Sequence, residues 1–198
     1  NMLAGRTDEN GVDCGFGGCR YSRPESRQDD FTILSPKVGL IYTIRDGQMV
    51  YLNASHGFRA PQATELYRLQ RGQQVADLKE VSLKNIELGL KGGAGDLTYS
   101  LSVYAMKKDN YIFRDADFFN VNQGKSDHLG SDIMVKWTVN DHFSVRGNWS
   151  LARHRYRFDY LTGGVNLNGL DVDSALRSYG GIQLKWKFHE EFVAEGQW

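Results

Sequence analysis

The chain has 198 residues, and its 24 basic and 24 acidic side chains cancel, so no net field over the whole chain attracts nucleic acid. Its mean hydropathy of −0.50, with no apolar run near the ~18 residues of a helical span, excludes transmembrane helices but leaves open a membrane β-barrel. Three prolines against 22 glycines, with 10 Tyr, 10 Phe and 4 Trp, favour strands and turns. We therefore expect an all-β fold.

The first 30 residues are interpreted as one long loop. The start, Asn1-Met2-Leu3, has neither a basic region nor an apolar core, so we expect no signal peptide in this sequence. Cys14 and Cys19 lie in a glycine-rich segment of this loop. In a chain exported to the periplasm, two cysteines this close favour a disulfide, whereas a metal site would need further ligands, and no histidine lies nearby.

The first hairpin is predicted between residues 37 and 55. Apolar residues occupy the even positions from Val38 to Ile44, and polar or small ones occupy most of the odd positions. Strict alternation predicts a strand with two different faces. Asp46-Gly47 is a tight-turn signal, and the alternation resumes from Val50 to Ala54.

Three further hairpins repeat this pattern. They cover residues 85–105, 129–151 and 181–198, with turns predicted at Gly92–Asp96, Asn140-Asp141 and His189–Glu191. The prediction is therefore an antiparallel meander of about eight strands. The last strand still alternates at Trp198 with no turn or cap after it, which we interpret as a strand interrupted in mid-course, so that the chain is a fragment.

Connection lengths and aromatic residues favour a membrane barrel. Links within hairpins are short, whereas those between hairpins are long: 57–84, 107–128 and 154–178. Outer-membrane barrels combine short periplasmic turns with long extracellular loops, and such loops are uncommon in compact soluble domains. Aromatic residues that flank two turns on the apolar face suit a girdle at the lipid–water interface: Trp137, Phe143, Trp186, Phe188 and Phe192. A soluble β-sandwich, which also alternates, remains the alternative at this point.

Several motifs then carry a resemblance. The stretch Tyr51 to Tyr67, with Gly57-Phe58-Arg59-Ala60-Pro61 inside it, and the preceding Ser35-Pro36-Lys37 strand resemble the barrel of TonB-dependent outer-membrane receptors. Asn85–Lys91 is similar to the family's E-x-G-x-K strand. Asn122–Lys125 resembles a later family motif, in which Asp132 stands where Glu is usual. The similarity runs from about Phe31 to Trp198.

The resemblance implies a partial transmembrane β-barrel of a 22-stranded receptor. Residues 1–30 would be a long extracellular loop and residues 31–198 a single partial barrel domain, with the plug domain absent. Such receptors lie in the bacterial outer membrane, contact its lipid, and import scarce nutrients with energy from the TonB complex, which acts through the plug. A ferric siderophore is the expected ligand, and no nucleic acid is expected as a partner. The alternatives are a small autonomous eight-stranded barrel with a structural or adhesion role and a soluble β-sandwich binding module.

Two of the long loops supply the candidate binding residues. Cationic and aromatic side chains together suit an anionic, ring-containing ligand. The candidates are Arg59, Tyr67, Arg68, Tyr111, Phe113 and Arg114. For Arg59 a structural role is favoured, because Gly57 and Pro61 bracket it.

Other chemistry receives weaker support from the sequence. The five histidines show no metal-ligand spacing; His128 and His154 are candidates for haem capture, although ordinary surface or lumen positions are favoured. Asp115/Asp117 and Asp171/Asp173 could offer oxygen ligands to Ca²⁺, but solvated turns are favoured. Signatures of hydrolases, P-loop enzymes and zinc proteases are missing, so we expect neither an enzyme nor a cofactor.

Overall fold

The computed structural model describes residues 21–22, 28–67, 69–70, 73, 76–115, 118–173 and 175–198. Cys14, Cys19 and Arg68 lie outside the described residues, as does most of the predicted 1–30 loop. Within the described part, no helix has the length and hydropathy of a transmembrane helix.

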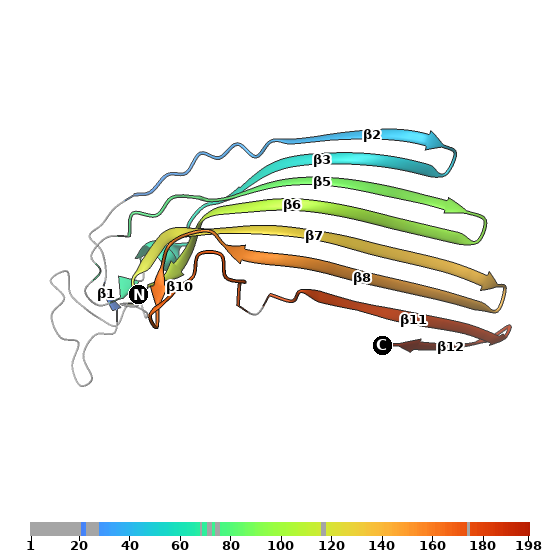
Figure 1. Ribbon diagram of the computed structural model, residues 1–198. Helices are drawn as coiled ribbons and strands as arrows, with labels where there is room; N and C mark the ends of the chain where they lie inside the picture. Colours follow the sequence, from blue (N-terminus) through green and yellow to red (C-terminus); the bar gives the residue numbers. More distant parts are fainter. Residues whose placement is uncertain are drawn as a thin grey trace.

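Eight strands form one antiparallel sheet, in which they lie side by side (Figure 1). The strands are β2 (Lys37–Arg45), β3 (Gln48–Arg59), β5 (Val81–Ala94), β6 (Leu97–Arg114), β7 (Asn120–Asn140), β8 (Phe143–Tyr156), β11 (Ser178–His189) and β12 (Phe192–Gln197). Each pairs with its sequence neighbours, in the order β12-β11-β8-β7-β6-β5-β3-β2. The predicted all-β meander of eight strands is therefore confirmed.

The sheet is open. Strands β2 and β12 lie at opposite edges and do not pair with each other. The eight strands therefore do not close into a barrel of their own, as the alternative of a small autonomous barrel requires. The described residues also provide no second sheet that could pack on this one as in a β-sandwich; the other strands form only two-stranded pairs, β1 (Tyr21–Ser22) with β4 (Leu69–Gln70) and β9 (Leu161–Thr162) with β10 (Val165–Asn166).

The four hairpin turns gather at one end of the sheet, and the longer connections lie at the other (Figure 1). Each turn has two residues between its strands: Asp46-Gly47, Gly95-Asp96, Asp141-His142 and Glu190-Glu191. Gly47 and Gly95 have φ values of 75° and 56°, which a residue without Cβ adopts at little cost. The second turn is shorter than predicted because the Gly92-Gly93-Ala94 segment continues β5.

The predicted loop from Lys107 to His128 is wrong in its extent. Strand β6 runs to Arg114 and β7 begins at Asn120, so most of this segment is paired strand. The apolar/polar alternation does not predict these strands, for two reasons. Polar residues occupy both faces here, and a register shift between Lys108 and Tyr111 inserts an extra residue into β6, which breaks the alternation.

The cross-strand register places apolar side chains on one face of all eight strands. From β2 to β8, one row across the sheet is apolar except for one serine; it contains Leu40, Leu52, Leu88, Val103, Ser131 and Leu151. Most large side chains on this face are exposed, for example Leu40 (64%) and Leu129 (64%). We call this surface the apolar belt. It ends at the level of Ala105 and Leu129, beyond which Lys107 and Asp127 occupy the same face.

The aromatic residues predicted on the apolar face lie there. Trp186 is in register with Phe143, and Trp137 pairs with Val145 of the same face. The rings of Phe188 and Phe192 stack with centroids 6.0 Å apart across the last turn. The prediction of an aromatic group at the turn end of the apolar belt is confirmed.

A small buried core lies among the connections rather than on the sheet. Leu66 of the helix α1 (Ala63–Tyr67) and Leu69 pack with Ala76 and Leu78, and Ile112 of β6 contacts this cluster. Because these side chains are withdrawn from water, the helix α1, Leu69 and residues 76–78 have a fixed position against the end of β6.

Candidate functional site

Five aromatic rings gather where the sheet meets its long connections. Tyr111 and Phe113 come from β6, Tyr156 ends β8, and Phe158 and Tyr160 follow it in the chain. The Phe113 centroid lies 5.4 Å from that of Phe158 and 5.2 Å from that of Tyr160, the latter edge to face. Phe158 is buried, and the other four rings are half-buried. We call these five residues the aromatic cluster.

The irregularity in β6 brings two of these rings to the inner face, the face opposite the apolar belt. Before the register shift, the even-numbered residues of β6, such as Lys108, point to this face. After the shift, the odd-numbered residues Tyr111 and Phe113 point to it. Asn110, with φ of 56°, adopts the left-handed conformation at this point, which Asn tolerates better than most residues. The Tyr111 ring lies across from Gly124, so closely that a Cβ there would be 2.4 Å from a ring carbon.

The cluster is apolar enough to change the acidity of a tyrosine. Burial, with smaller contributions from the neighbouring Tyr156 and from Asp173, raises the pKa of Tyr111 to about 12. The phenol is therefore neutral at physiological pH.

Asn166 and Asn168 fix the segment that carries Phe158 and Tyr160. Their side-chain amides donate to Asp159 Oδ1 over 2.9 Å and 3.1 Å, and these bonds lower the pKa of Asp159. The aromatic residues on either side of Asp159 are thereby held on one side of the segment.

Two cations border the cluster. Lys108 Nζ lies 5.2 Å from the centroid of the Tyr111 ring, and the exposed Arg114 ends β6. Within the described residues, neither forms an ion pair. Arg114 and Phe113 also line a shallow cavity of about 360 Å³. In the described part of the chain, the cluster therefore combines ring faces with two cations that form no ion pair.

Arg59 does not line this cavity and instead holds residues 60–67, the start of the connection after β3. Its guanidinium donates to both carboxylate oxygens of Glu65, over 3.0 Å and 3.2 Å, and the backbone N–H of Gln62 donates to Glu65 Oε2 over 2.6 Å. Partial burial raises the pKa of Glu65, but the hydrogen bonds and the Arg59 charge outweigh it and leave the pKa below its ordinary value.

Tyr67 also contributes to the position of the connection. Its hydroxyl donates to Asp29 Oδ2 over 2.6 Å, and its ring packs on the buried core. Nearby, the buried side chains of Gln73 and Asn120 join the connection to β7: Gln73 exchanges two hydrogen bonds with the Asn120 backbone, and Asn120 Nδ2 donates to the Glu65 carbonyl. Of the described candidates, the structure thus brings together Tyr111, Phe113 and Arg114, and places Arg59 and Tyr67 in the supporting connection.

The sequence interpretation missed Tyr156, Phe158 and Tyr160. The signal was present, because aromatic and charged residues alternate from Tyr156 to Tyr160 and a period of two places the rings on one side. It was overlooked because residues 154–178 were interpreted as a loop.

Two of the predicted histidines form a pair. His128 of β7 and His154 of β8 are in register, and their Nδ1 atoms lie 2.6 Å apart. Burial, His154 and Lys108 lower the pKa of His128 below its ordinary value. Among the described residues, no group of three or more His, Cys, Asp and Glu side chains is arranged to hold a metal ion. Asp171 of the predicted Ca²⁺ candidates instead pairs with Arg155 and Arg177.

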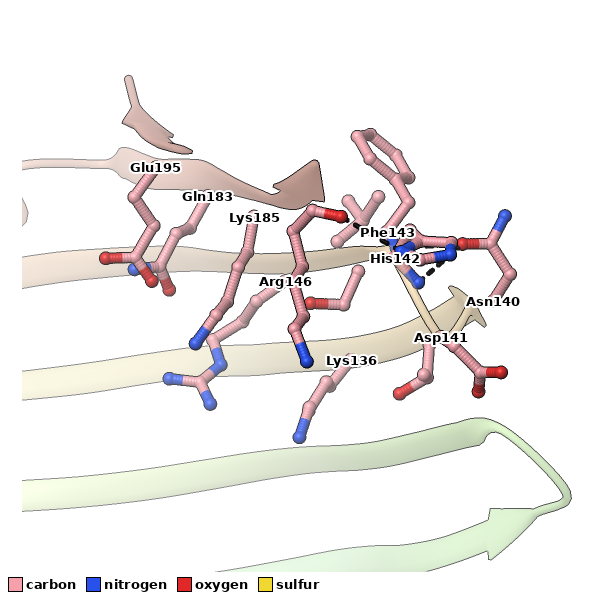
Figure 2. A pocket seen from close by; sticks show the side chains of 13 residues that line it. Lys136, Asn140, Asp141, His142, Phe143, Arg146, Gln183, Lys185 and Glu195 are labelled. Carbon is pink, nitrogen blue, oxygen red and sulfur yellow. Dashed lines mark hydrogen bonds between the residues drawn. The ribbon is translucent and has the colours of Figure 1, made fainter. Parts of the chain in front are cut away.

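A second cavity, of about 410 Å³, lies at the turn end of the sheet. Figure 2 shows Lys136, Arg146 and Lys185 extending to one side of the sheet while Phe143 extends to the other. Lys136 and Arg146 are directly paired across β7 and β8. Four basic side chains and two acidic ones, Asp141 and Glu195, line this cavity, so basic residues outnumber acidic ones near the turns.

The family of the chain follows from sequence comparison. A family model described as "TonB dependent receptor-like, beta-barrel" matches residues 8–198. The chain belongs to the TonB-dependent receptor β-barrel family. No curated protein sequence matches it.

Solved structures share the fold at low sequence identity. The "Copper transporter OprC" superposes with a TM-score of 0.66 and 14% identity, over 83% of this chain and 25% of that one. The ferric-catecholate import receptor Fiu from K12 E. coli has a TM-score of 0.63 and 16% identity, over 81% and 23% of the two chains. The ferripyoverdine receptor of the outer membrane of Pseudomonas aeruginosa, bound to ferripyoverdine, has a TM-score of 0.62 and 18% identity, over 82% of this chain and 22% of that one. This receptor-barrel chain thus spans about a quarter of the length of each.

Proposed function

We propose that this chain forms part of the wall of an outer-membrane receptor that imports a ferric siderophore with energy from the TonB complex. The observation that carries the proposal is the aromatic cluster with Lys108 and Arg114 beside it, on the inner face and beyond the apolar belt. A ferric siderophore with aromatic chelating groups and net negative charge offers ring faces and anionic oxygens to such a surface.

The dimensions of the apolar belt support the membrane part of the proposal. On β7 the outward apolar positions extend from Leu129 to Val139, which is about 33 Å of strand at ~3.3 Å per residue. With a tilt of about 40°, this length covers about 25 Å, the height of the apolar band of outer-membrane barrels. The exposed apolar side chains would then contact lipid, and the aromatic cluster would lie on the extracellular side.

The proposal is tested with the full-length receptor in an outer-membrane preparation. Binding of three probes is measured by quenching of protein fluorescence: a ferric tris-catecholate, a ferric hydroxamate and haemin. We expect a ferric siderophore probe to bind, and Phe113→Ala and Arg114→Ala each to weaken its binding about tenfold. Arg45→Ala, which removes an exposed cation at the turn end, is the matched control and should leave the affinity unchanged.

Two outcomes would contradict the proposal. One is binding of haemin alone. The other is siderophore binding that Phe113→Ala and Arg114→Ala leave intact, because the ligand surface would then lie elsewhere. Uptake of ⁵⁵Fe by cells with and without a functional TonB complex separates binding from energised import.

A further inference from the structure

Three side chains with metal-binding atoms form a row on the inner face. Met106 of β6 is in register with His128 of β7, which is in register with His154 of β8. All three are half-buried, and the two Nδ1 atoms are 2.6 Å apart. The row lies at the edge of the apolar belt and includes none of the aromatic cluster.

The surroundings of His128 orient its ring. His128 Nε2 lies 2.9 Å from Ser126 Oγ, and Ser126 is only 3% exposed. When Nε2–H donates to this hydroxyl, the Nδ1 lone pair is directed at His154. Metal-binding histidines are commonly held in this way, by a hydrogen bond from the other ring nitrogen. Two imidazole nitrogens this close are joined either by a proton, which one ring donates to the other, or by a metal ion.

We propose that His128, His154 and Met106 bind one Cu(I) ion. Two imidazoles and a thioether form a soft donor set, and thioether sulfur favours Cu(I) among the biological metals. Zn²⁺ in structural sites takes four ligands, one more than this row provides. The Lys108 ammonium, which acts on His128 through its charge, opposes a monovalent ion less than a divalent one.

Little movement is needed to admit the ion. With metal–nitrogen bonds of about 2.0–2.1 Å, two nitrogens at a tetrahedral angle are about 3.3 Å apart. The two Nδ1 atoms must therefore separate by less than about 1 Å from their present 2.6 Å, which side-chain rotation provides without a change in strand register. The ion takes the place of the His154 Nδ1 proton that joins the rings in its absence; this proton passes to solvent and His154 takes one up at Nε2, so each ring keeps one proton.

The test is a competition experiment on the purified full-length receptor. Cu(I) is titrated anaerobically in the presence of a coloured Cu(I) chelator of known affinity. We expect the wild-type receptor to hold one more Cu(I) ion than the His128→Ala/His154→Ala double variant. Met106→Leu and Ser126→Ala should each weaken this site about tenfold or more. X-ray absorption of the loaded receptor should show a sulfur neighbour that Met106→Leu removes.

His56→Ala is the matched control. His56 also lies in the sheet and contacts a serine, Ser82, at 3.3 Å, but its ring has no second histidine beside it, so the variant should retain the ion. Equal Cu(I) uptake by the wild type and the double variant would overturn the proposal. Retention of full affinity and of the sulfur signal in Met106→Leu would overturn the assigned ligand set. Heat-dependent migration on gels shows that each variant has assembled, and the siderophore assay above involves different residues, so the two proposals fail independently.

Discussion

At the scale of single residues, aromatic rings lie directly across from glycines in neighbouring strands. The Tyr104 ring covers Gly130, and the Tyr51 ring covers Gly89, where a Cβ would lie 2.2 Å from a ring carbon. Because these glycines have no side chain, the rings can lie flat over the inner face in the space that a Cβ would occupy. Tyr51 is also fixed by a 2.6 Å hydrogen bond from its hydroxyl to Glu87. Ring position here depends on the absence of a side chain on the next strand.

Gly130→Ala should destabilise the barrel by about 1–3 kcal/mol, the range for overpacking. The added Cβ would lie 2.4 Å from the Tyr104 ring and 2.9 Å from the Leu151 carbonyl oxygen, and the carbonyl belongs to the rigid backbone. The free energy of unfolding of the full-length receptor in guanidinium measures this effect. Gly147→Ala is the control, because nothing lies within 4 Å of its added Cβ. Equal losses of stability in the two variants would contradict the argument.

The Arg59–Glu65 pair predicts a dependence on pH. Because the pKa of Glu65 is lowered on folding, its contribution is complete above the ordinary value of 4.5 and is lost as the pH falls through the folded pKa. Arg59 is exposed, so the contribution is less than about 1 kcal/mol. Hydrogen exchange of the 60–67 backbone, corrected for intrinsic rates, should show constant protection from pH 8 to 5 and a decline below that.

Glu65→Gln is the matching variant. Its amide retains a hydrogen bond but lacks the charge, so protection should already be weak at pH 7 and should change little with acid. A decline in acid as steep as in the wild type would assign the pH dependence to another group.

At the scale of elements, the irregular segment of β6 decides which side chains belong to the binding surface. With an uninterrupted alternation, Tyr111 and Phe113 would share the face of Lys107 rather than that of Lys108. The extra residue at Asp109–Asn110 turns them inward, and Asn110 anchors this point by donating from Nδ2 to the Glu80 carbonyl over 3.3 Å.

Deletion of Asp109 and Asn110 together should place Tyr111 directly after Lys108 in an uninterrupted alternation and so turn Tyr111 and Phe113 to the outer face. Binding of the siderophore probe should then fall at least as far as in Phe113→Ala, while the barrel still assembles. Asn110→Gly is the control, since glycine adopts a φ of 56° readily, and it should bind the probe normally. A Tyr111→Cys label that stays accessible from the lumen after the deletion would contradict this account.

The sequence predicted the strands well where one face is apolar and the other polar, as from Val38 to Ile44 or from Leu97 to Ala105. It failed beyond Lys107, because paired strands outside the apolar belt have polar residues on both faces and an inserted residue disrupts the period. Only part of the aromatic cluster was predicted, because its residues also lie beyond the apolar belt, where the alternation is lost. Tyr111 and Phe113 were chosen by composition, whereas their partners Phe158 and Tyr160 depend on contacts between β6 and a connection more than forty residues away. No local pattern specifies such contacts.

At the scale of the whole molecule, the sheet has two chemically different faces and a small core at one end. The belt exposes large side chains such as Leu40, Ile133 and Trp186, an apolar surface that a water-soluble monomer does not leave uncovered. The inner face holds polar groups in hydrogen bonds, such as Ser150 Oγ with Asp132 Oδ1 at 2.5 Å. This division between an apolar and a polar face is the central claim of the account.

A spin-label scan along β7 of the full-length receptor in lipid bilayers tests that claim most directly. Single labels from Leu129 to Val139 are compared for collisions with oxygen, which concentrates in lipid, and with a water-soluble nickel chelate. We predict high oxygen accessibility at Leu129, Ile133, Val135 and Trp137, and low oxygen accessibility at Gly130, Asp132, Met134 and Lys136, in strict alternation. Uniform accessibility along the strand, or a pattern with the opposite phase, would contradict the assignment of lipid to the apolar belt.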